Sequence, residues 1–208
     1  FWKWRMHGGA ISLARIFNEL DESFDLILCS DMLDLTTFLS LTRAKSSNIP
    51  TVIYFHENQL SYPWSPDDRD LIQKRDKHYG FINYSSALVA DQCFFNSDYH
   101  RSSFLSELPK LLKHFPDFNE LDTINYIESK SSTLYLGLDL KRFDHYRLNK
   151  KNTPIILWNH RWEYDKNPKT FFRLLNKLKN NNINFKIVIL GENFSETPYD
   201  FKKNISVL

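Results

Sequence analysis

The sequence predicts an α/β protein built from parallel sheets, and two observations lead to this prediction. Short apolar runs typical of buried strands alternate along the 208 residues with longer segments whose apolar residues recur at helical spacing. Clusters of polar side chains come directly after several of these strands, where open parallel sheets bind their ligands. Strands that alternate with helices favour parallel sheets covered by helices on both faces.

The predicted elements follow one another in a regular order. The first helix is expected over 10–20, where apolar residues from Ala10 to Phe17 lie on or near one stripe. Further helices are expected over 33–44, 67–89, 98–112 and 168–179, and strands over 24–29, 51–55, 92–96, 132–136, 154–157 and 185–190. Ser97 and Asn167 are the expected N-caps, and Pro168 suits a first helical position. The segment 113–130 is expected to be irregular and to end in a helix.

The length of the chain allows one large domain or two small ones. The basic segment 141–152 is the best candidate boundary, so we expect one domain over 1–145 and the start of a second over 146–208. The chain opens at Phe1 without a Met and stops at Leu208 while another apolar segment is beginning. We therefore expect a fragment of a longer protein.

Composition narrows the class of protein only loosely. A net charge of +2 is too small to indicate a nucleic-acid binder, and the basic run after Lys141 favours a solvated linker over an RNA contact. Cys29 and Cys93 each lie inside an apolar strand, which predicts buried free thiols and is consistent with a reducing cytoplasm. No signal peptide is visible, and no apolar run is long enough to span a bilayer.

A loop between a strand and a helix carries Arg161 and Lys166, with His160 beside them. The amino end of a helix favours anions, and a guanidinium fork together with an ammonium group suits a diphosphate. A solvated surface pair is the alternative on spacing alone. The strand–Arg-x4-Lys–helix unit resembles the nucleotide-sugar site of the retaining GT-B glycosyltransferases.

Polar residues also gather at the carboxyl ends of three strands in the first half of the chain. Asp31 follows the first strand, His56, Glu57, Asn58 and Gln59 follow the second, and Asn96 and Ser97 follow the third. Such groups orient a sugar or a base, while an aromatic side chain such as Tyr62 can stack on it. A loop held by its own hydrogen bonds is the alternative, and His56 fits a general base, a donor or a structural role. The histidines and carboxylates lack the spacing of a metal site, so no metal is expected.

Five segments in order resemble the tRNA-queuosine mannosyltransferase family, a branch of the retaining GT-B glycosyltransferases. They are WRMHGGA (4–10), CSDMLDL (29–35), FHENQLSYP (55–63), FFNSDYHR (94–101) and WNHRWEYDKNP (158–168). The stretch 135–143 also resembles the interdomain element Gly-x-Asp-x-x-x-Phe of the wider superfamily.

This resemblance implies transfer of mannose from GDP-mannose to the cyclopentenediol of queuosine in tRNA, with retention and without a metal. It implies a GT-B fold, in which two Rossmann-like parallel-sheet domains face a cleft, both incomplete in this fragment. The nucleotide sugar and queuosine-containing tRNA would be the partners, in the cytoplasm and without a membrane. A lipid, glycan or protein acceptor, or a non-catalytic module that binds a nucleotide or RNA, are the alternatives.

The resemblance also implies roles for individual residues. His56 and Glu57 would lie near the reacting centre, with Arg161 and Lys166 on the donor diphosphate facing them across the cleft. Gly8 and Gly9 would let the backbone approach the donor closely. The remaining substrate contacts would come from Asp31, Asn58, Gln59, Tyr62, Asn96, Ser97, His160 and Glu192.

Overall fold

The computed structural model describes residues 2–65, 68–72, 78–146 and 153–191. Contacts divide the chain into two compact units, one within Phe1–Trp64 and Arg69–Leu138 and the other within Ser65–Asp68 and Asp139–Leu208. The division falls close to the expected boundary, and the domain limits of 1–145 and 146–208 stay a prediction.

The first unit contains a parallel sheet of four strands. These are β1 (Ile27–Ser30), β2 (Thr51–Phe55), β3 (Gln92–Phe95) and β4 (Ser131–Thr133), and their order in the sheet is the order in the chain. All neighbouring strands run parallel, so the predicted α/β class with parallel sheets is confirmed. The fourth strand is shorter than the sequence predicted, because the expected strand over 132–136 pairs only as far as Thr133.

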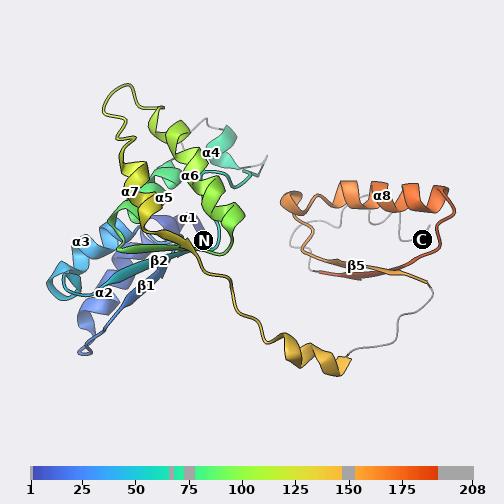
Figure 1. Ribbon diagram of the computed structural model, residues 1–208, viewed down its shortest axis with the longest axis horizontal. Coiled ribbons are helices and arrows are strands. Elements are labelled where there is room, and N and C mark those ends of the chain that lie inside the picture. Colours follow the sequence, from blue (N-terminus) through green and yellow to red (C-terminus); the bar gives the residue numbers. More distant parts are fainter. Residues whose placement is uncertain (1, 66–67, 73–77, 147–152, 192–208) are drawn as a thin grey trace. The chain divides into compact units, whose positions relative to one another are not determined.

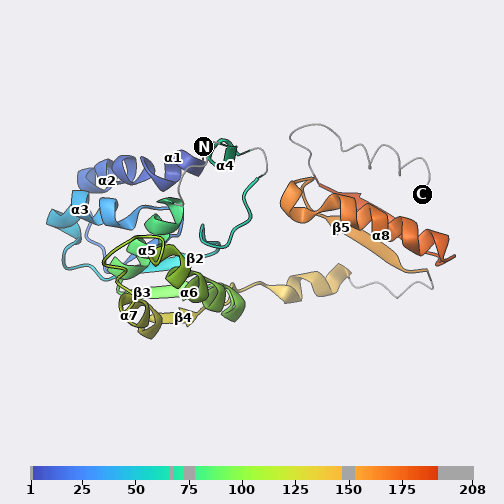
Figure 2. The same cartoon turned by 90° about the horizontal axis from the view of Figure 1, so that it is seen from above.

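Two helices precede this sheet in the chain, and the other helices of the unit connect its strands. They are α1 (Trp2–Met6), α2 (Gly9–Glu19), α3 (Leu35–Ser46), α4 (Arg69–Ile72), α5 (His78–Val89), α6 (Asp98–Leu112) and α7 (Thr123–Ser129). In Figures 1 and 2, α2 and α3 lie toward the β1 end of the sheet, and α6 and α7 toward the β4 end. The helix predicted over 67–89 is described as α4 and α5, and 73–77 lie outside the described residues.

Side-chain caps fix where the helices begin. Asp34 Oδ1 accepts a hydrogen bond from Thr37 N at 3.0 Å at the start of α3, and Ser97 Oγ accepts one from His100 N at 3.2 Å at the start of α6. Each such cap satisfies a backbone N–H that has no partner within the helix, and it contributes about 1 kcal/mol. The predicted cap at Ser97 is therefore confirmed.

The core of the first unit lies against the sheet. Phe55 on β2 stacks on Phe95 on β3 with ring centroids 4.8 Å apart, and Phe104 on α6 packs against Phe55 at 4.9 Å. All three rings are fully buried. Burying each of them stabilises the fold by about 2–3 kcal/mol, so this cluster fixes α6 on the sheet beside the carboxyl ends of β2 and β3.

Both cysteines are free thiols within the same sheet, as predicted. Cys93 is buried, whereas Cys29 is only half-buried because β1 lies at the edge of the sheet. Burial raises the pKa of Cys29 to about 12 and that of Cys93 to about 11. Neither thiol is therefore a reactive thiolate at neutral pH.

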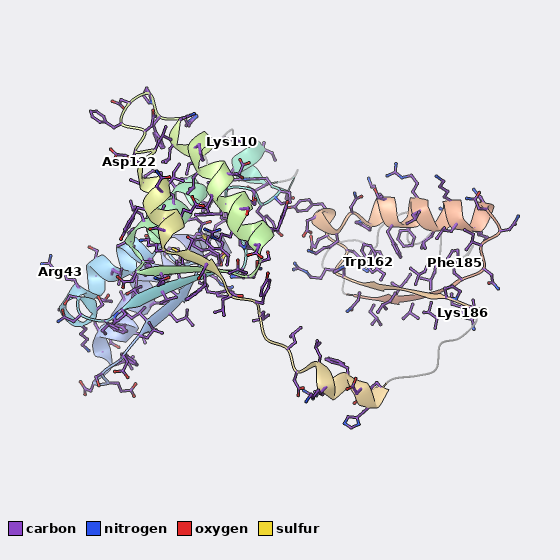
Figure 3. All side chains as sticks on the ribbon, in the orientation of Figure 1. Arg43, Lys110, Asp122, Trp162, Phe185 and Lys186 are labelled. Carbon is purple, nitrogen blue, oxygen red and sulfur yellow. The ribbon has the colours of Figure 1, made fainter. Side chains whose placement is uncertain are left out.

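The second unit contains a pair of parallel strands, β5 (Ile155–Asn159) and β6 (Lys186–Leu190), joined by α8 (Pro168–Asn180). Two short 3-10 helices, η1 (Leu140–Tyr146) and η2 (Tyr164–Lys166), precede β5 and α8 respectively. Figure 3 shows side chains filling the space between α8 and the strands, with Trp162 and Phe185 at opposite ends. Trp162 stacks on Trp158 at 5.2 Å and on Phe172 at 5.8 Å. This aromatic packing positions the loop between β5 and α8.

Of the helices in the described ranges, none combines the length and the apolar character needed to cross a bilayer.

Candidate functional site

The carboxyl ends of β1, β2 and β3 bring together the polar residues that the sequence placed there. Ser30 pairs with Tyr54 and Phe55 with Phe95, so Asp31, His56 and Asn96 emerge side by side from neighbouring strands. Asp31 N also donates to Tyr54 O at 3.3 Å, and Asn96 N to Phe55 O at 3.2 Å. The expectation that these residues share one edge of the sheet is confirmed.

Asp31 and His56 form the centre of this edge. The Asp31 carboxylate is fully buried, and its Oδ1 accepts a hydrogen bond from the His56 backbone N–H at 3.2 Å. The same oxygen pairs with Nδ1 of the His56 ring, whose side chain is 50% exposed. The imidazole is therefore held by the protein at Nδ1 and reaches solvent with the rest of its ring. In the neutral ring this contact places the proton on Nδ1, which leaves Nε2 as an acceptor.

The charge state of Asp31 follows from its surroundings. Burial raises the pKa of this carboxyl to about 6, although the charge and the backbone N–H of His56 both act to lower it. Glu57 raises it further by repulsion between like charges. Asp31 is consequently ionised at neutral pH, but by a narrow margin.

Asn83 on α5 joins the loops that follow β1 and β2, and it was missed by sequence reasoning. Its side chain is fully buried, its Nδ2 donates to Asp31 O at 2.8 Å, and its Oδ1 accepts from Gln59 N at 2.8 Å. A polar residue in a largely apolar helix was the only signal in the sequence. Asn83 therefore fixes the backbone of the loop after β1 and of the loop after β2.

The loop after β2 is also held by its own side chains. Asn58 is buried, and its Oδ1 accepts hydrogen bonds from Leu60 N at 3.1 Å and from Ser61 N at 3.0 Å. Gln59 is buried as well, and its Nε2 donates to Glu57 Oε1 at 3.3 Å. The self-supporting loop weighed from the sequence is therefore present. A direct substrate contact for Asn58 or Gln59 stays a prediction.

Asn96 holds the backbone of His56 from the end of β3. Its Nδ2 donates to His56 O at 2.9 Å, and its Oδ1 lies 3.0 Å from His100 Nδ1 and accepts from Ser97 Oγ at 3.2 Å. Burial lowers the pKa of His100, with a further contribution from the nearby charge of His56. Buried His100 Nε2 has no hydrogen-bond partner in the described part of the chain. His100 is a second histidine of this edge that was not among the predicted site residues.

Tyr62 lies beyond these polar residues on the same loop. Its side chain is exposed, and its backbone N donates to Asn58 O at 3.2 Å. The exposed ring is compatible with the stacking role expected for it, which stays a prediction.

Gly8 lies against the indole of Trp4, a contact that the sequence did not reveal. A Cβ at Gly8 would lie only 2.2–2.4 Å from carbons of the Trp4 indole, so a larger residue at position 8 would require the exposed Trp4 side chain to move. A Cβ at Gly9 would lie at an ordinary distance of 3.7 Å from Trp4 O. The expected approach of Gly8 and Gly9 to the donor stays a prediction.

In the second unit, the loop between β5 and α8 presents Arg161 and Lys166 as predicted. Asn167 Oδ1 accepts from Thr170 N at 3.3 Å, and Pro168 takes the first helical position, which confirms the predicted start of α8. Lys166 Nζ lies 2.8 Å from Asp165 Oδ2, so its charge is partly balanced within the loop. Arg161 is exposed and forms no hydrogen bond or ion pair with the described residues.

His160 contributes its backbone to this loop. Trp158 Nε1 donates to His160 O at 2.9 Å, and the two rings meet edge to face at 5.7 Å. Gly191 after β6 has a φ of +137°, and a Cβ there would lie 2.1 Å from His160 O. The carboxyl ends of β5 and β6 thus approach each other closely only because residue 191 is glycine. Glu192, an expected substrate contact, lies outside the described residues.

Within the described residues, no group of three or more His, Cys, Asp or Glu side chains is arranged to hold a metal ion. The expectation of metal-free chemistry stays a prediction.

The fold and the polar edge of the first sheet define the structural class of the protein. Parallel sheets with crossover helices, and polar residues at the carboxyl ends of the strands, are those of a Rossmann-like α/β protein. Comparison with known proteins gives the family. A family model described as tRNA-queuosine alpha-mannosyltransferase N-terminal matches residues 1–138. A tRNA-queuosine alpha-mannosyltransferase from Drosophila melanogaster is 33% identical over 211 residues.

The chain therefore belongs to the tRNA-queuosine alpha-mannosyltransferase family, as the five segments predicted. The alignment covers 97% of this chain and 54% of the Drosophila relative. The chain thus spans about half the length of that relative.

Proposed function

We propose that the full-length protein transfers mannose from GDP-mannose to queuosine in tRNA, with retention of configuration at the anomeric carbon. Membership of the family is the observation that carries this proposal, because the alignment extends over 97% of the chain, including the loop of Arg161 and Lys166. The edge centred on His56 supports it, because a half-exposed imidazole backed by a buried carboxylate is the kind of group that acts on a hydroxyl.

The proposed architecture is of GT-B type, with two Rossmann-like domains that face each other across a cleft. Two separate parallel sheets and the division of the chain between Leu138 and Asp139 support it. In this arrangement the edge with His56 and Glu57 serves the acceptor and the sugar, and the loop of Arg161 and Lys166 serves the donor diphosphate.

The donor chemistry follows from charge. Breaking the bond between the sugar and the phosphate builds negative charge on the leaving diphosphate, and a guanidinium and an ammonium can balance it. Arg161 is available for this role, and the amino end of α8 adds backbone N–H groups directed toward an anion. Lys166 would have to divide its charge between Asp165 and the diphosphate.

The acceptor chemistry follows from the neutral form of His56. A hydroxyl of the cyclopentenediol attacks the anomeric carbon on the face from which the diphosphate departs, which retains the configuration. Its proton must leave as the new C–O bond forms and the bond to the phosphate breaks, either to a phosphate oxygen of the leaving group or to a base of the protein. Nε2 of His56 is a nitrogen of this edge that can accept the proton, while Tyr62 and Glu57 would contact the base or its diol. We assign the reaction to the cytoplasm, in keeping with the free thiols of Cys29 and Cys93.

The acceptor is tested by incubating the purified full-length protein with radiolabelled GDP-mannose and two forms of one tRNA. One form carries queuosine and the other carries guanosine at the same position. We expect label only in the queuosine form, with and without a chelator. Label in the guanosine form, or preferential transfer to a lipid carrier, would contradict the proposed acceptor.

The donor loop is tested in the same assay with matched substitutions. Arg161→Ala and Lys166→Ala should each lower turnover at least ~100-fold, because each removes a charge from the leaving diphosphate. Arg173→Ala and Lys177→Ala, which change exposed residues of α8, are the controls and should stay within about twofold. Near-normal turnover of either loop variant would show that the diphosphate is held elsewhere.

A further inference from the structure

Asp31 was expected to contact the substrate, but its carboxylate is enclosed by protein. Both carboxylate oxygens are buried, and the only side chain that an oxygen of this group pairs with in the described residues is the ring of His56. A group without exposed surface cannot touch a sugar or a tRNA base. Its geometry gives it a different task.

We propose that Asp31 is the positioning residue of His56: it holds Nδ1–H of the imidazole, so that Nε2 is presented to the acceptor hydroxyl and the ring can take up its proton. One carboxylate oxygen accepts from both the backbone N–H and Nδ1 of His56, which fixes the ring and its chain together. This role rests on the proposed function, whereas the orientation of the ring does not.

The surrounding contacts make this orientation rigid. Asn83 Nδ2 holds Asp31 O at 2.8 Å, and Asn96 Nδ2 holds His56 O at 2.9 Å. The backbone of the carboxylate and the backbone of the imidazole are thus each fixed by a separate amide, one from α5 and one from the end of β3. Positioning residues act through such preorganised contacts, because the ring then needs no reorganisation during the reaction.

The second oxygen of Asp31 argues against a purely structural role. Asp31 Oδ2 is buried and has no hydrogen-bond partner in the described part of the chain. Burying a carboxylate with one oxygen unpaired opposes folding, and a neutral side chain could hold the His56 N–H without this penalty. A charged group at this position gains its advantage when the ring beside it becomes positive, which happens when Nε2 accepts a proton.

Other titratable groups face the pair and belong to any account of its pH dependence. Glu57 repels the Asp31 carboxylate, and the charge of His56 acts on His100 from the other side. Cys29 on β1 also feels the charge of Asp31, but its thiol is held protonated by burial. Among the described residues that these interactions involve, Asp31 is the one whose side chain pairs with the His56 ring.

The orientation is tested by ¹⁵N NMR of histidine-labelled full-length protein, a measurement that needs no activity. Neutral His56 should carry its proton on Nδ1 in the wild type, and Asp31→Asn should weaken or reverse that preference. Asp34→Asn is the matched control, because Asp34 caps α3 on the same loop and asparagine still caps. A wild-type His56 protonated at Nε2, or a tautomer unchanged in Asp31→Asn, would overturn the proposal.

The catalytic consequence is tested by a double-mutant cycle on mannose transfer. Asp31→Asn should lower kcat at least ~100-fold and leave the donor KM within about threefold, a loss in the range of one proton-transfer group. In the His56→Ala background the same change should have less than about a twofold effect, because Asp31 acts through the ring. Losses that multiply would overturn the proposal in favour of a structural role. Full turnover of His56→Ala would refute the role of His56 in the proposed function, and the NMR result would still decide the orientation.

Discussion

Asn83 is the residue whose removal should reveal how the functional edge is built. Asn83→Ala leaves two buried backbone groups without a partner, Asp31 C=O and Gln59 N–H, each now hydrogen-bonded at 2.8 Å. An unsatisfied buried group costs about 1–3 kcal/mol, so the two together should lower the free energy of unfolding by about 2–6 kcal/mol. Partial entry of water would give the lower end of this range.

The assay is urea unfolding of the full-length protein, followed by tryptophan fluorescence. Asn83→Leu separates the hydrogen bonds from the cavity, because leucine fills a similar volume without a polar group. Asn125→Ala, at an exposed position of α7, is the control and should change stability by less than about 0.5 kcal/mol. A loss below about 1 kcal/mol for both Asn83 variants would refute the reasoning that this side chain fixes the two loops.

Three further predictions concern Asp31, Gly191 and His56. The pKa of Asp31 is raised from 3.8 to about 6, so the folded protein binds a proton at this carboxyl more tightly than the unfolded chain does. The protonated carboxyl therefore contributes stability below pH 4, and this contribution is lost as the pH rises through 6. In urea unfolding, the free energy of unfolding of Asp31→Asn should therefore rise relative to that of the wild type by up to ~3 kcal/mol between pH 4 and pH 7. A difference between the two proteins that does not change with pH would contradict this. Gly191→Ala should destabilise the second unit by more than ~2 kcal/mol in thermal unfolding, through its positive φ and the contact with His160 O, whereas Gly137→Ala, with open space around it, should be neutral. His56→Ala should lower kcat and leave the donor KM nearly unchanged in steady-state kinetics, and the reverse pattern would show that the ring only binds donor.

The sequence was sufficient for the sheet and for the place of the site. Apolar runs mark buried strands that alternate with segments of helical periodicity, so parallel sheets could be predicted from local pattern alone. The caps at Ser97 and Asn167 are local as well, since the side chain bonds a backbone N–H three residues on. Polar residues that directly follow a strand must emerge at its carboxyl end, which is why Asp31 and His56 were predicted to share one edge.

The roles within that edge could not be predicted in the same way. Asp31 and His56 both follow strands, yet one is fully buried and the other half-exposed. This difference depends on tertiary packing, as where Asn83 of α5 binds the backbone of Asp31. Asn83 lies in sequence far from both loops it holds, and in a helix it resembles any other polar residue. The contact of Gly8 with the Trp4 indole could not be predicted either, because it depends on where α1 packs.

The most direct test of the proposed function is the queuosine content of tRNA in cells that lack this gene. Nucleosides from such cells should be analysed by liquid chromatography and mass spectrometry, after complementation with the wild-type gene or with His56→Ala. We predict that mannosylated queuosine is absent without the gene, returns with the wild type and does not return with His56→Ala at equal protein level. Mannosylated queuosine at a normal level in cells without the gene, or full recovery with His56→Ala, would contradict the account.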